Sequence, residues 1–370
     1  MRAVVLITAF TLAPACSASP IAPSPVPSIP LAPPSDASDA PVDATQDSAA
    51  EARSSEAEPD AALSGCPSDM KLVDGDFCTR VEQKCRRKWN SKYTHKTVCM
   101  EFEAPSRCVG DKQHKRFCID TYEWPNVAGQ RPEVMSNFYQ AQVKCASVGK
   151  RLCTETEWTQ ACEGPEMKPF PNGYVRDPLK CNGDHLWDDP SLKKVEAYDP
   201  DELARLWKGV RSGSQPGCIS DYGVADMPAN VDEVSFNEEI LPFSRDKYDN
   251  AITGGNWYQG VRNQCRPKVY THDDGWSYYF LGLRCCAEPD GKPSDPRAPR
   301  QIAHGWDFKR VESLARFTTE QMREKLLLKR EGKCTCAVRD TLCRIMCGDM
   351  LGPRAHDADP NRIIPKPGRD

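Results

Sequence analysis

The sequence lacks a second long apolar run. After the first sixteen residues of this 370-residue chain, no stretch has the length and apolar character that crosses a bilayer. Hydrophobic residues make up only 39% of the chain. The length is enough for one large domain or two smaller ones. The composition therefore excludes a protein with several membrane spans.

Several catalytic signatures are also missing. There is no Gly-x-Ser-x-Gly elbow and no Walker loop, so hydrolase and NTPase functions have no support. The six histidines are scattered, with no His-x-x-x-His pair. An iron site can be drawn from His185, His272 and Asp273, but nothing in their spacing favours it over ordinary surface histidines. No Cys-x-x-Cys pair occurs, and Cys334-x-Cys336 is too close for the usual zinc knuckle.

Cysteine, by contrast, is abundant. The chain has nineteen cysteines, and eighteen remain when Cys16 is set aside. An even number in an exported protein predicts up to nine disulfides, which form and persist in oxidising compartments. The pairing cannot be deduced from the sequence.

The N-terminus has the pattern of an export signal. Arg2 supplies a positive charge, and residues 3–13 form a short apolar core. The segment 12–16, Leu-Ala-Pro-Ala-Cys, resembles a bacterial lipobox, although Pro14 intrudes; it also fits ordinary signal cleavage. Both interpretations leave Cys16 at the mature N-terminus. We expect a lipid anchor on Cys16 that holds the protein to the membrane of the cell envelope; the alternative is a soluble periplasmic or secreted protein.

Residues 17–64 read as a disordered linker of Pro, Ala, Ser and Asp. The segment has eight acidic residues against the single basic Arg53, so charge repulsion and proline keep it extended. Without the signal and this linker the chain is near neutral, and nucleic acid is not an expected partner.

The expected folded part covers residues 65–290, and its first section, 65–117, is rich in cysteine. A strand is predicted near residues 117–123 and a helix at 136–147, with Ser136 as its cap. A second helix follows the Thr154-x-x-Glu157 capping box. Residues 165–250 predict long ordered loops, and residues 291–370 a C-terminal helix, 319–331, with a cysteine-rich appendage.

Five segments, taken in order, resemble the sulfatase-modifying factor, or formylglycine-generating enzyme, family. They are residues 118–126 (CIDTYEWPN), 149–158 (GKRLCTETEW), 226–233 (DMPANVDE), 254–257 (GGNW) and 281–285 (LGLRC). The resemblance covers roughly residues 66–287. It implies an α+β domain related to C-type lectins, rich in loops and disulfides.

The family's known activity is oxidation of a sulfatase cysteine by oxygen and Cu(I), which two thiolates hold. The positions of those two thiolates fall here on Gln259 and Gln264, beside Cys265. Cys265 alone cannot form a two-thiolate site, so copper is not expected. Cys265 is the one residue we consider as a surviving catalytic thiol; the alternative is a disulfide with Cys285, Cys286 or another cysteine.

The resemblance also implies calcium. The family's ligands fall on the side chains of Asp226 and Glu233 and the carbonyl groups of Ala229 and Val231, and oxygen ligands suit Ca²⁺. A second calcium site would use four further positions: Asn182, Gly183, Glu196 and Tyr198.

Aromatic and basic residues are dense between residues 254 and 286. We expect them to line a groove for a peptide, protein or glycan ligand, although some can instead be buried core residues or ion-pair partners. The candidate contacts are Trp257, Gln259, Arg266, Trp276 and Arg284. The predicted function is non-catalytic binding in the cell envelope; the alternatives are an active formylglycine-generating or other metal-dependent oxidase, or a purely structural envelope protein.

Overall fold

The computed structural model describes residues 65–90, 95–241, 248–258 and 260–359. The predicted signal, Cys16 anchor and linker lie outside these residues. None of the helices in the described segments has both the length and the apolar character needed to span a bilayer.

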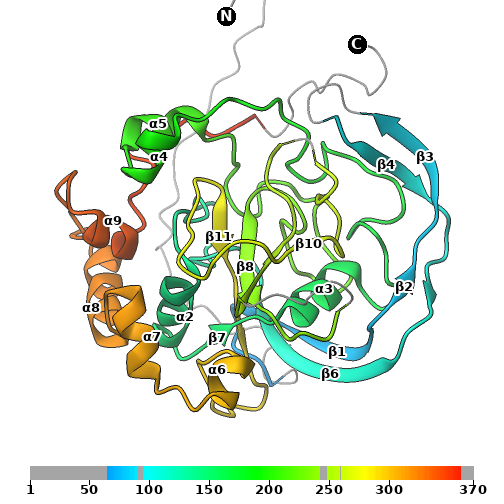
Figure 1. Ribbon diagram of the computed structural model, residues 1–370, viewed down its shortest axis with the longest axis horizontal. Helices are drawn as coiled ribbons and strands as arrows, with labels where there is room; N and C mark the ends of the chain where they lie inside the picture. Colours follow the sequence, from blue (N-terminus) through cyan, green and yellow to red (C-terminus); the bar gives the residue numbers. More distant parts are fainter. Residues whose placement is uncertain (1–64, 91–94, 242–247, 259, 360–370) are drawn as a thin grey trace, which may run out of the picture. The chain divides into compact units, whose positions relative to one another are not determined.

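Two four-stranded sheets form the framework (Figure 1). The first has the antiparallel order β1-β6-β12-β7. The second has the order β10-β9-β8-β11, in which β8 and β11 are parallel. Two ribbons, β2-β5 and β3-β4, lie in the N-terminal part. The strands are β1 (Met70–Cys78), β2 (Val81–Glu82), β3 (Cys85–Asn90), β4 (Thr97–Phe102), β5 (Arg107–Cys108), β6 (Lys112–Asp120), β7 (Arg151–Leu152), β8 (Asp232–Phe236), β9 (Asn250–Thr253), β10 (Lys268–Val269), β11 (Leu281–Leu283) and β12 (Cys285–Ala287).

The first two helices, α2 and α3, both begin at a capping box. The Thr154 capping box is confirmed, because Thr154 accepts from the amide of Glu157 at the start of α3. The first helix, α2, is capped by Asn137 rather than Ser136, because the Asn137 side chain and Gln140 complete a capping box. The helices are α2 (Phe138–Ser147), α3 (Glu155–Glu163), α4 (Leu192–Glu196), α5 (Pro200–Leu206), α6 (Pro299–Ala303), α7 (Phe308–Ala315), α8 (Thr319–Arg330) and α9 (Thr341–Cys347).

The nine disulfides predicted from the cysteine count are present. Two of them involve adjacent cysteines of β12, where side chains of successive residues point to opposite faces of the sheet. Cys285 therefore reaches Cys145 on α2, and Cys286 reaches Cys153 at the start of α3. The two bridges lie in different apolar clusters. The paired cysteines thus join both cores to one strand. The remaining pairs are Cys66–Cys118, Cys78–Cys108, Cys85–Cys99, Cys162–Cys265, Cys181–Cys218, Cys334–Cys347 and Cys336–Cys343.

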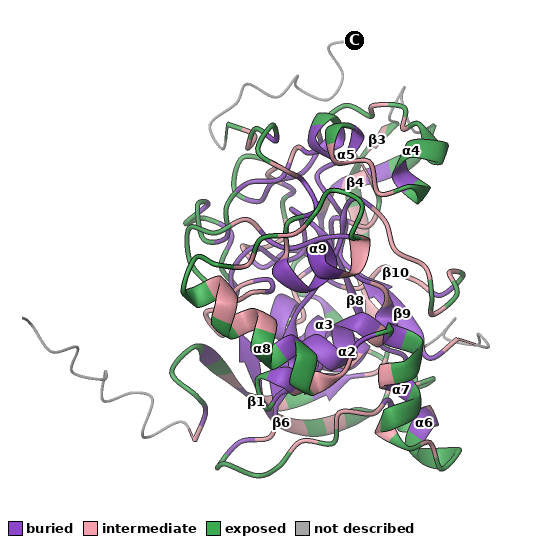
Figure 2. Ribbon diagram, turned by 90° about the vertical axis from the view of Figure 1, so that its left-hand side faces the viewer, coloured by how far each residue is buried: buried purple, intermediate pink, exposed green. Residues whose placement is uncertain are grey.

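The C-terminal helices pack on α2. Val311 and Ala315 of α7, and Met322 of α8, are fully buried in the main apolar cluster with Phe138 of α2. Figure 2 shows α2 and α3 almost wholly buried, while much of α8 faces solvent. The helix predicted at 319–331 is confirmed as α8.

A buried ion cluster fixes this packing. Lys144 of α2 and Lys329 of α8 both contact the carboxylate of Glu133, and the Trp124 indole donates to the same group at 2.9 Å. The side chains of Lys144 and Glu133 are only 1% and 3% exposed. The two ammonium groups lower the pKa of Glu133 to about 2, against the effect of burial.

Replacing Glu133 with Gln should destabilise the protein by about 3–5 kcal/mol, because it leaves Lys144 charged and buried without a counter-ion. Chemical denaturation with the disulfides intact measures this. A Glu331→Gln control removes an exposed pair with Lys333 and should cost less than about 1 kcal/mol.

The pH dependence provides a second measure of the same substitution. A carboxylate whose pKa is lowered on folding stabilises the protein above its unfolded pKa. Wild-type protein should therefore lose this contribution as the pH falls from about 4.5 toward 2, and the Glu133→Gln protein should lack that loss. Equal stability of the two proteins at pH 7 would show that the ion cluster does not stabilise the fold.

Candidate binding site

A groove of about 290 Å³ opens at the second sheet. Its floor comes from the buried ends of β8 and β9, and its wall from the connection between β10 and β11. We call it the aromatic groove, and its lining residues are Asp232, Ile252, Arg262, Val269, His272, Trp276, Tyr278 and Phe280.

Three stacked rings form the wall of the groove. The His272 and Trp276 rings lie 3.9 Å apart and 7° from parallel, and Tyr278 continues the stack at 5.2 Å from Trp276. A tight turn at Asp273 produces this stack, because its carbonyl accepts from the Trp276 amide and its carboxylate from the Gly275 amide. The three rings are half-buried. Burial, with the nearby charge of Arg262, lowers the pKa of His272, so its ring is neutral at pH 7.

A charged pair closes the floor. One N–H group of Arg262 donates a hydrogen bond to the Gly254 carbonyl at 2.9 Å, and another donates to Asp232 Oδ2 at 2.5 Å. Burial raises the pKa of Asp232, and the guanidinium of Arg262 opposes that rise. The groove thus presents aromatic faces beside the guanidinium of Arg262, which the Gly254 carbonyl and the buried Asp232 hold in place.

The paired glycines hold Arg262 in place. Gly254 has φ +71°, and a side chain there would meet the Pro228 carbonyl and the ring of Trp158. A Cβ on Gly255 would lie 2.5 Å from Asn263. The turn predicted from this glycine pair is therefore a close approach of three backbone segments.

Among the predicted ligand contacts, the groove contains Trp276. Trp257 is instead fully buried against Trp207. Arg266 makes a two-nitrogen ion pair with Glu163, and Arg284 one with Glu233. Trp257 and Arg284 are buried and Arg266 is mostly covered, and none of the three lines the groove. Gln259 lies outside the described residues. The groove also contains Arg262, His272 and Tyr278; the density of aromatic and basic residues in the segment indicated a groove but not which of these side chains line it.

Cys265 is not a free thiol, which corrects its candidacy as a catalytic residue. Its sulfur is bonded to Cys162 of α3, and the residue is fully buried. The partner is therefore neither Cys285 nor Cys286, because β12 directs those toward α2 and Cys153. Gln264, at one of the two thiolate positions, is also buried.

One of the calcium ligands that the resemblance suggests, Glu233, is already part of a buried ion pair. Glu233 already accepts from Arg284 with both oxygens, and from the Trp158 indole at 2.9 Å. Asp226 differs: its Oδ2 accepts from the Gly213 amide, while its buried Oδ1 has no partner among the described residues. Glu233 therefore does not fit as a calcium ligand in this arrangement, whereas Asp226 Oδ1 does.

The electrostatics of this region favour an added positive charge. Glu123, Asp226 and Glu233 are all buried around the single Arg284. Burial raises the pKa of Asp226 to about 6, and burial together with Asp226 raises that of Glu123 well above its usual value. Protons or a cation would relieve this excess of carboxylates.

The four residues of the second predicted calcium site contact different partners and differ in burial. Asn182 donates to Asn230 and to the Lys208 carbonyl. Glu196 is exposed at the end of α4, and the Tyr198 hydroxyl meets Ser277. Gly183 lies beside Asn263. Among the described residues, one group of three or more metal-ligating side chains has its ligand atoms together, and it consists of Cys336, Cys343 and Cys347.

Comparison with solved structures finds likenesses of low identity. PvdO from Pseudomonas aeruginosa is 16% identical over 60% of this chain and 95% of its own, with a TM-score of 0.36. Treponema denticola variable protein 1 is 14% identical over 59% of this chain and 95% of its own, with a TM-score of 0.35. CarF is 12% identical over 60% of this chain and 99% of its own, with a TM-score of 0.33. No curated protein sequence matches the chain significantly.

The family comparison is more extensive. The model of the sulfatase-modifying factor enzyme 1-like domain matches residues 75–289, which is more than half of the 370 residues and contains all five segments of the sequence resemblance. The chain therefore belongs to the sulfatase-modifying factor enzyme 1-like domain family.

Proposed function

We propose that this protein is a non-catalytic binding module of the cell envelope that holds an extended peptide or glycan in the aromatic groove. The observation that carries the proposal is the half-exposed stack of His272, Trp276 and Tyr278 beside the Arg262–Asp232 pair. Aromatic faces with a few fixed polar groups are the usual composition of a ligand site.

The stack suits a ligand with flat or apolar faces. His272 and Tyr278 both stack on Trp276 and hold its ring in place, so a sugar ring or an apolar side chain can pack against the exposed edge of the stack. The ring wall is fixed before the ligand arrives, so little conformational entropy is lost on binding. Arg262, held by the buried Asp232, then supplies a donor that orients the ligand.

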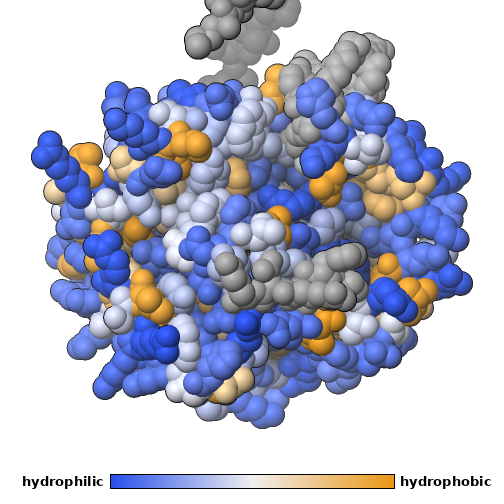
Figure 3. Space-filling model, viewed as in Figure 1, coloured by the Kyte–Doolittle hydropathy of each residue, from blue (hydrophilic) through white to orange (hydrophobic). Residues whose placement is uncertain are grey.

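The face drawn in Figure 3 does not favour a broad docking surface. The face drawn in Figure 3 is mostly hydrophilic, with apolar residues in small separate groups. Large contiguous apolar patches mark many protein–protein interfaces. A local groove that takes one segment of a partner fits the observed surface better.

The absence of free thiols in the described part of the chain supports the non-catalytic assignment. All eighteen cysteines from Cys66 to Cys347 are in disulfides. Cu(I) chemistry of the family's kind needs two thiolates. An oxidase that used Cys265 as a thiol would first require the Cys162–Cys265 bridge to be opened inside the core.

Export and lipid anchoring at Cys16 belong to the same proposal. Nine disulfides in one chain are typical of proteins that fold in an oxidising compartment. The acidic, proline-rich segment between Cys16 and residue 65 would hold the binding domain away from the membrane surface.

The first test is a Trp276→Ala substitution, assayed against arrays of peptides and glycans. Wild-type protein should bind members of one array, and the variant should bind them at least about tenfold more weakly, since loss of an aromatic anchor costs more than about 1.4 kcal/mol. The control is Trp187→Ala, which removes an indole that is 47% exposed and outside the groove; it should bind as wild type. Equal binding by all three proteins, or no binding to either array, would exclude the groove as the ligand site.

Calcium is proposed with a narrower ligand set than the sequence suggested. Asp226 Oδ1, with the carbonyl oxygens of Ala229 and Val231, would hold the ion, and Glu233 would stay with Arg284. The buried carboxylates of Glu123 and Asp226 supply the negative charge that a hard cation requires.

Adding about 1 mM Ca²⁺ to chelator-treated protein at pH 7 should raise Tm by about 2–4 °C, the expected effect of a site with extracellular affinity. The rise should shrink at pH 5, because the pKa of Asp226 is about 6 and protons then compete for its carboxylate. Asp226→Asn protein should show little response at either pH. An unchanged Tm in wild-type protein would show that calcium does not bind at this site.

A further inference from the structure

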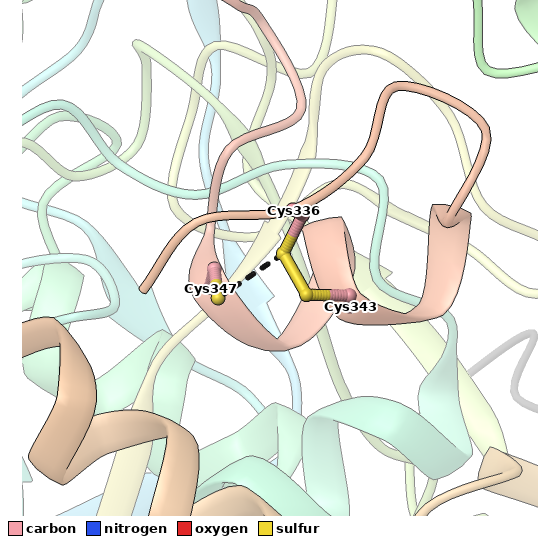
Figure 4. A group of neighbouring side chains, drawn as sticks. All are labelled: Cys336, Cys343 and Cys347. Carbon is pink, nitrogen blue, oxygen red and sulfur yellow. Dashed lines mark hydrogen bonds between the residues drawn. A yellow bond between two sulfur atoms is a disulfide. The ribbon is translucent and has the colours of Figure 1, made fainter. Parts of the chain in front are cut away.

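The three cysteines drawn in Figure 4 have no sulfur available to a ligand. Their sulfur atoms lie within 4.8 Å of one another, but Cys336 is bonded to Cys343, and Cys347 to Cys334, so each is closed in a disulfide. The aromatic groove differs, because several of its polar groups have no partner among the described residues. Those groups indicate which ligand the groove takes.

Hydrogen-bond donors dominate the polar groups of the groove. Arg262 has five N–H groups, and the described residues accept from two of them, at Gly254 and Asp232. The side chain is 24% exposed and lines the groove, so its remaining donors face the place of a ligand. The Trp276 indole can only donate, and no described residue accepts from it.

Acceptors are scarce in the same place. The Asp232 side chain is 1% exposed and already pairs with Arg262, so a ligand meets the guanidinium rather than this carboxylate. The neutral His272 ring has one nitrogen that accepts, and the Tyr278 hydroxyl can accept as well as donate. The groove therefore suits a ligand that brings more acceptors than donors.

The acidic side chains of the neighbouring turn are already engaged. The Asp273 carboxylate accepts from the Gly275 amide at 2.9 Å, and the Asp274 carboxylate accepts from the side chain of Asn250 at 2.7 Å. Neither acid lines the groove. Burial and the charge of Arg262 lower the pKa of His272, and Asp273 opposes them only in part. The positive charge of the guanidinium therefore extends to the ring wall.

The backbone around the groove does not suit an extended peptide. The floor strands β8 and β9 are inner strands of the second sheet, and their backbone groups pair with neighbouring strands. The edge strand, β10, has only two residues. A peptide also brings N–H groups that need acceptors, of which the groove has few. Sugar hydroxyls, by contrast, can accept from its donors.

We propose that the ligand of the aromatic groove is an acidic glycan, whose carboxylate binds the guanidinium of Arg262 while a sugar ring packs against the stack of His272, Trp276 and Tyr278. This inference rests on the proposed function of the groove and names its ligand class. A carboxylate accepts from two N–H groups of one guanidinium, and such charge-assisted bonds are about twice as strong as neutral ones. A hexuronic acid carries both parts, because its carboxylate is attached to the sugar ring.

The test compares acidic oligosaccharides with their carboxyl-reduced counterparts, in which a neutral hydroxymethyl group replaces each carboxylate. The probes are oligomers of galacturonic, mannuronic and glucuronic acid, and calorimetry on the full chain measures each affinity. Wild-type protein should bind at least one acidic oligomer, at least about tenfold more tightly than its reduced counterpart, because the reduced form loses the charged hydrogen bonds. This comparison needs no variant.

Variants then place the carboxylate in the groove. Arg262→Lys protein keeps a positive charge beside Asp232 but loses the planar pair of donors, so its preference for the acidic oligomer should fall at least about fivefold. The control is Arg205→Lys, because Arg205 also pairs with one carboxylate, that of Glu202, but lies outside the groove; its preference should match wild type. Trp276→Ala protein should bind both oligomers more weakly.

The outcomes separate this inference from the proposed function. Equal binding of the acidic and reduced oligomers by wild-type protein overturns the inference and leaves the groove as a site for a neutral glycan. Binding of peptides alone also overturns it, while the proposed function stands. An unchanged preference in Arg262→Lys protein places the carboxylate elsewhere and overturns it as well. If wild-type protein binds no oligomer and no member of the peptide and glycan arrays, both fail.

Discussion

The ion pair between Arg284 and Glu233 is the interaction on which the rest of the fold depends. Arg284 is 1% exposed and also donates to the carbonyl groups of Asp120 and Ala225, while Glu233 accepts from Trp158. Four of the five segments that resemble the family contribute to this one cluster of contacts. A buried ion pair repays its desolvation only when further hydrogen bonds satisfy both partners, and here those bonds come from distant parts of the chain.

This ion pair explains why the domain keeps its fold with little regular structure. It joins β8 to the end of β6 and to α3, and the adjacent cysteines of β12 add covalent links to α2 and to Cys153. The loops between these elements can then vary. The aromatic groove is built on such a loop, between β10 and β11, and a change of its residues need not disturb the centre.

Local signals in the sequence predicted part of this structure. The capping box at Thr154, the helix α8 and the nine disulfides could all be read from residue spacing and cysteine count. Long-range choices could not. Whether Arg284 lines a groove or pairs in the core depends on Glu233, which lies 51 residues away. The partner of Cys265 was missed for the same reason, since Cys162 lies 103 residues away and only the fold brings them together.

The family's fold persists here, whereas every cysteine in the described residues is in a disulfide and none offers the thiol that the family's oxidase chemistry needs. The most direct measurement is to incubate the purified protein with Cu(I), oxygen and a Cys-x-Pro-x-Arg peptide, under conditions in which a cysteine-pair member of the family converts that peptide. Mass spectrometry then detects loss of the peptide thiol. We predict that the peptide is unchanged, because the sulfur of Cys265 is bonded to Cys162. Conversion that disappears in Cys265→Ser protein would show that Cys265 acts as a catalytic thiol.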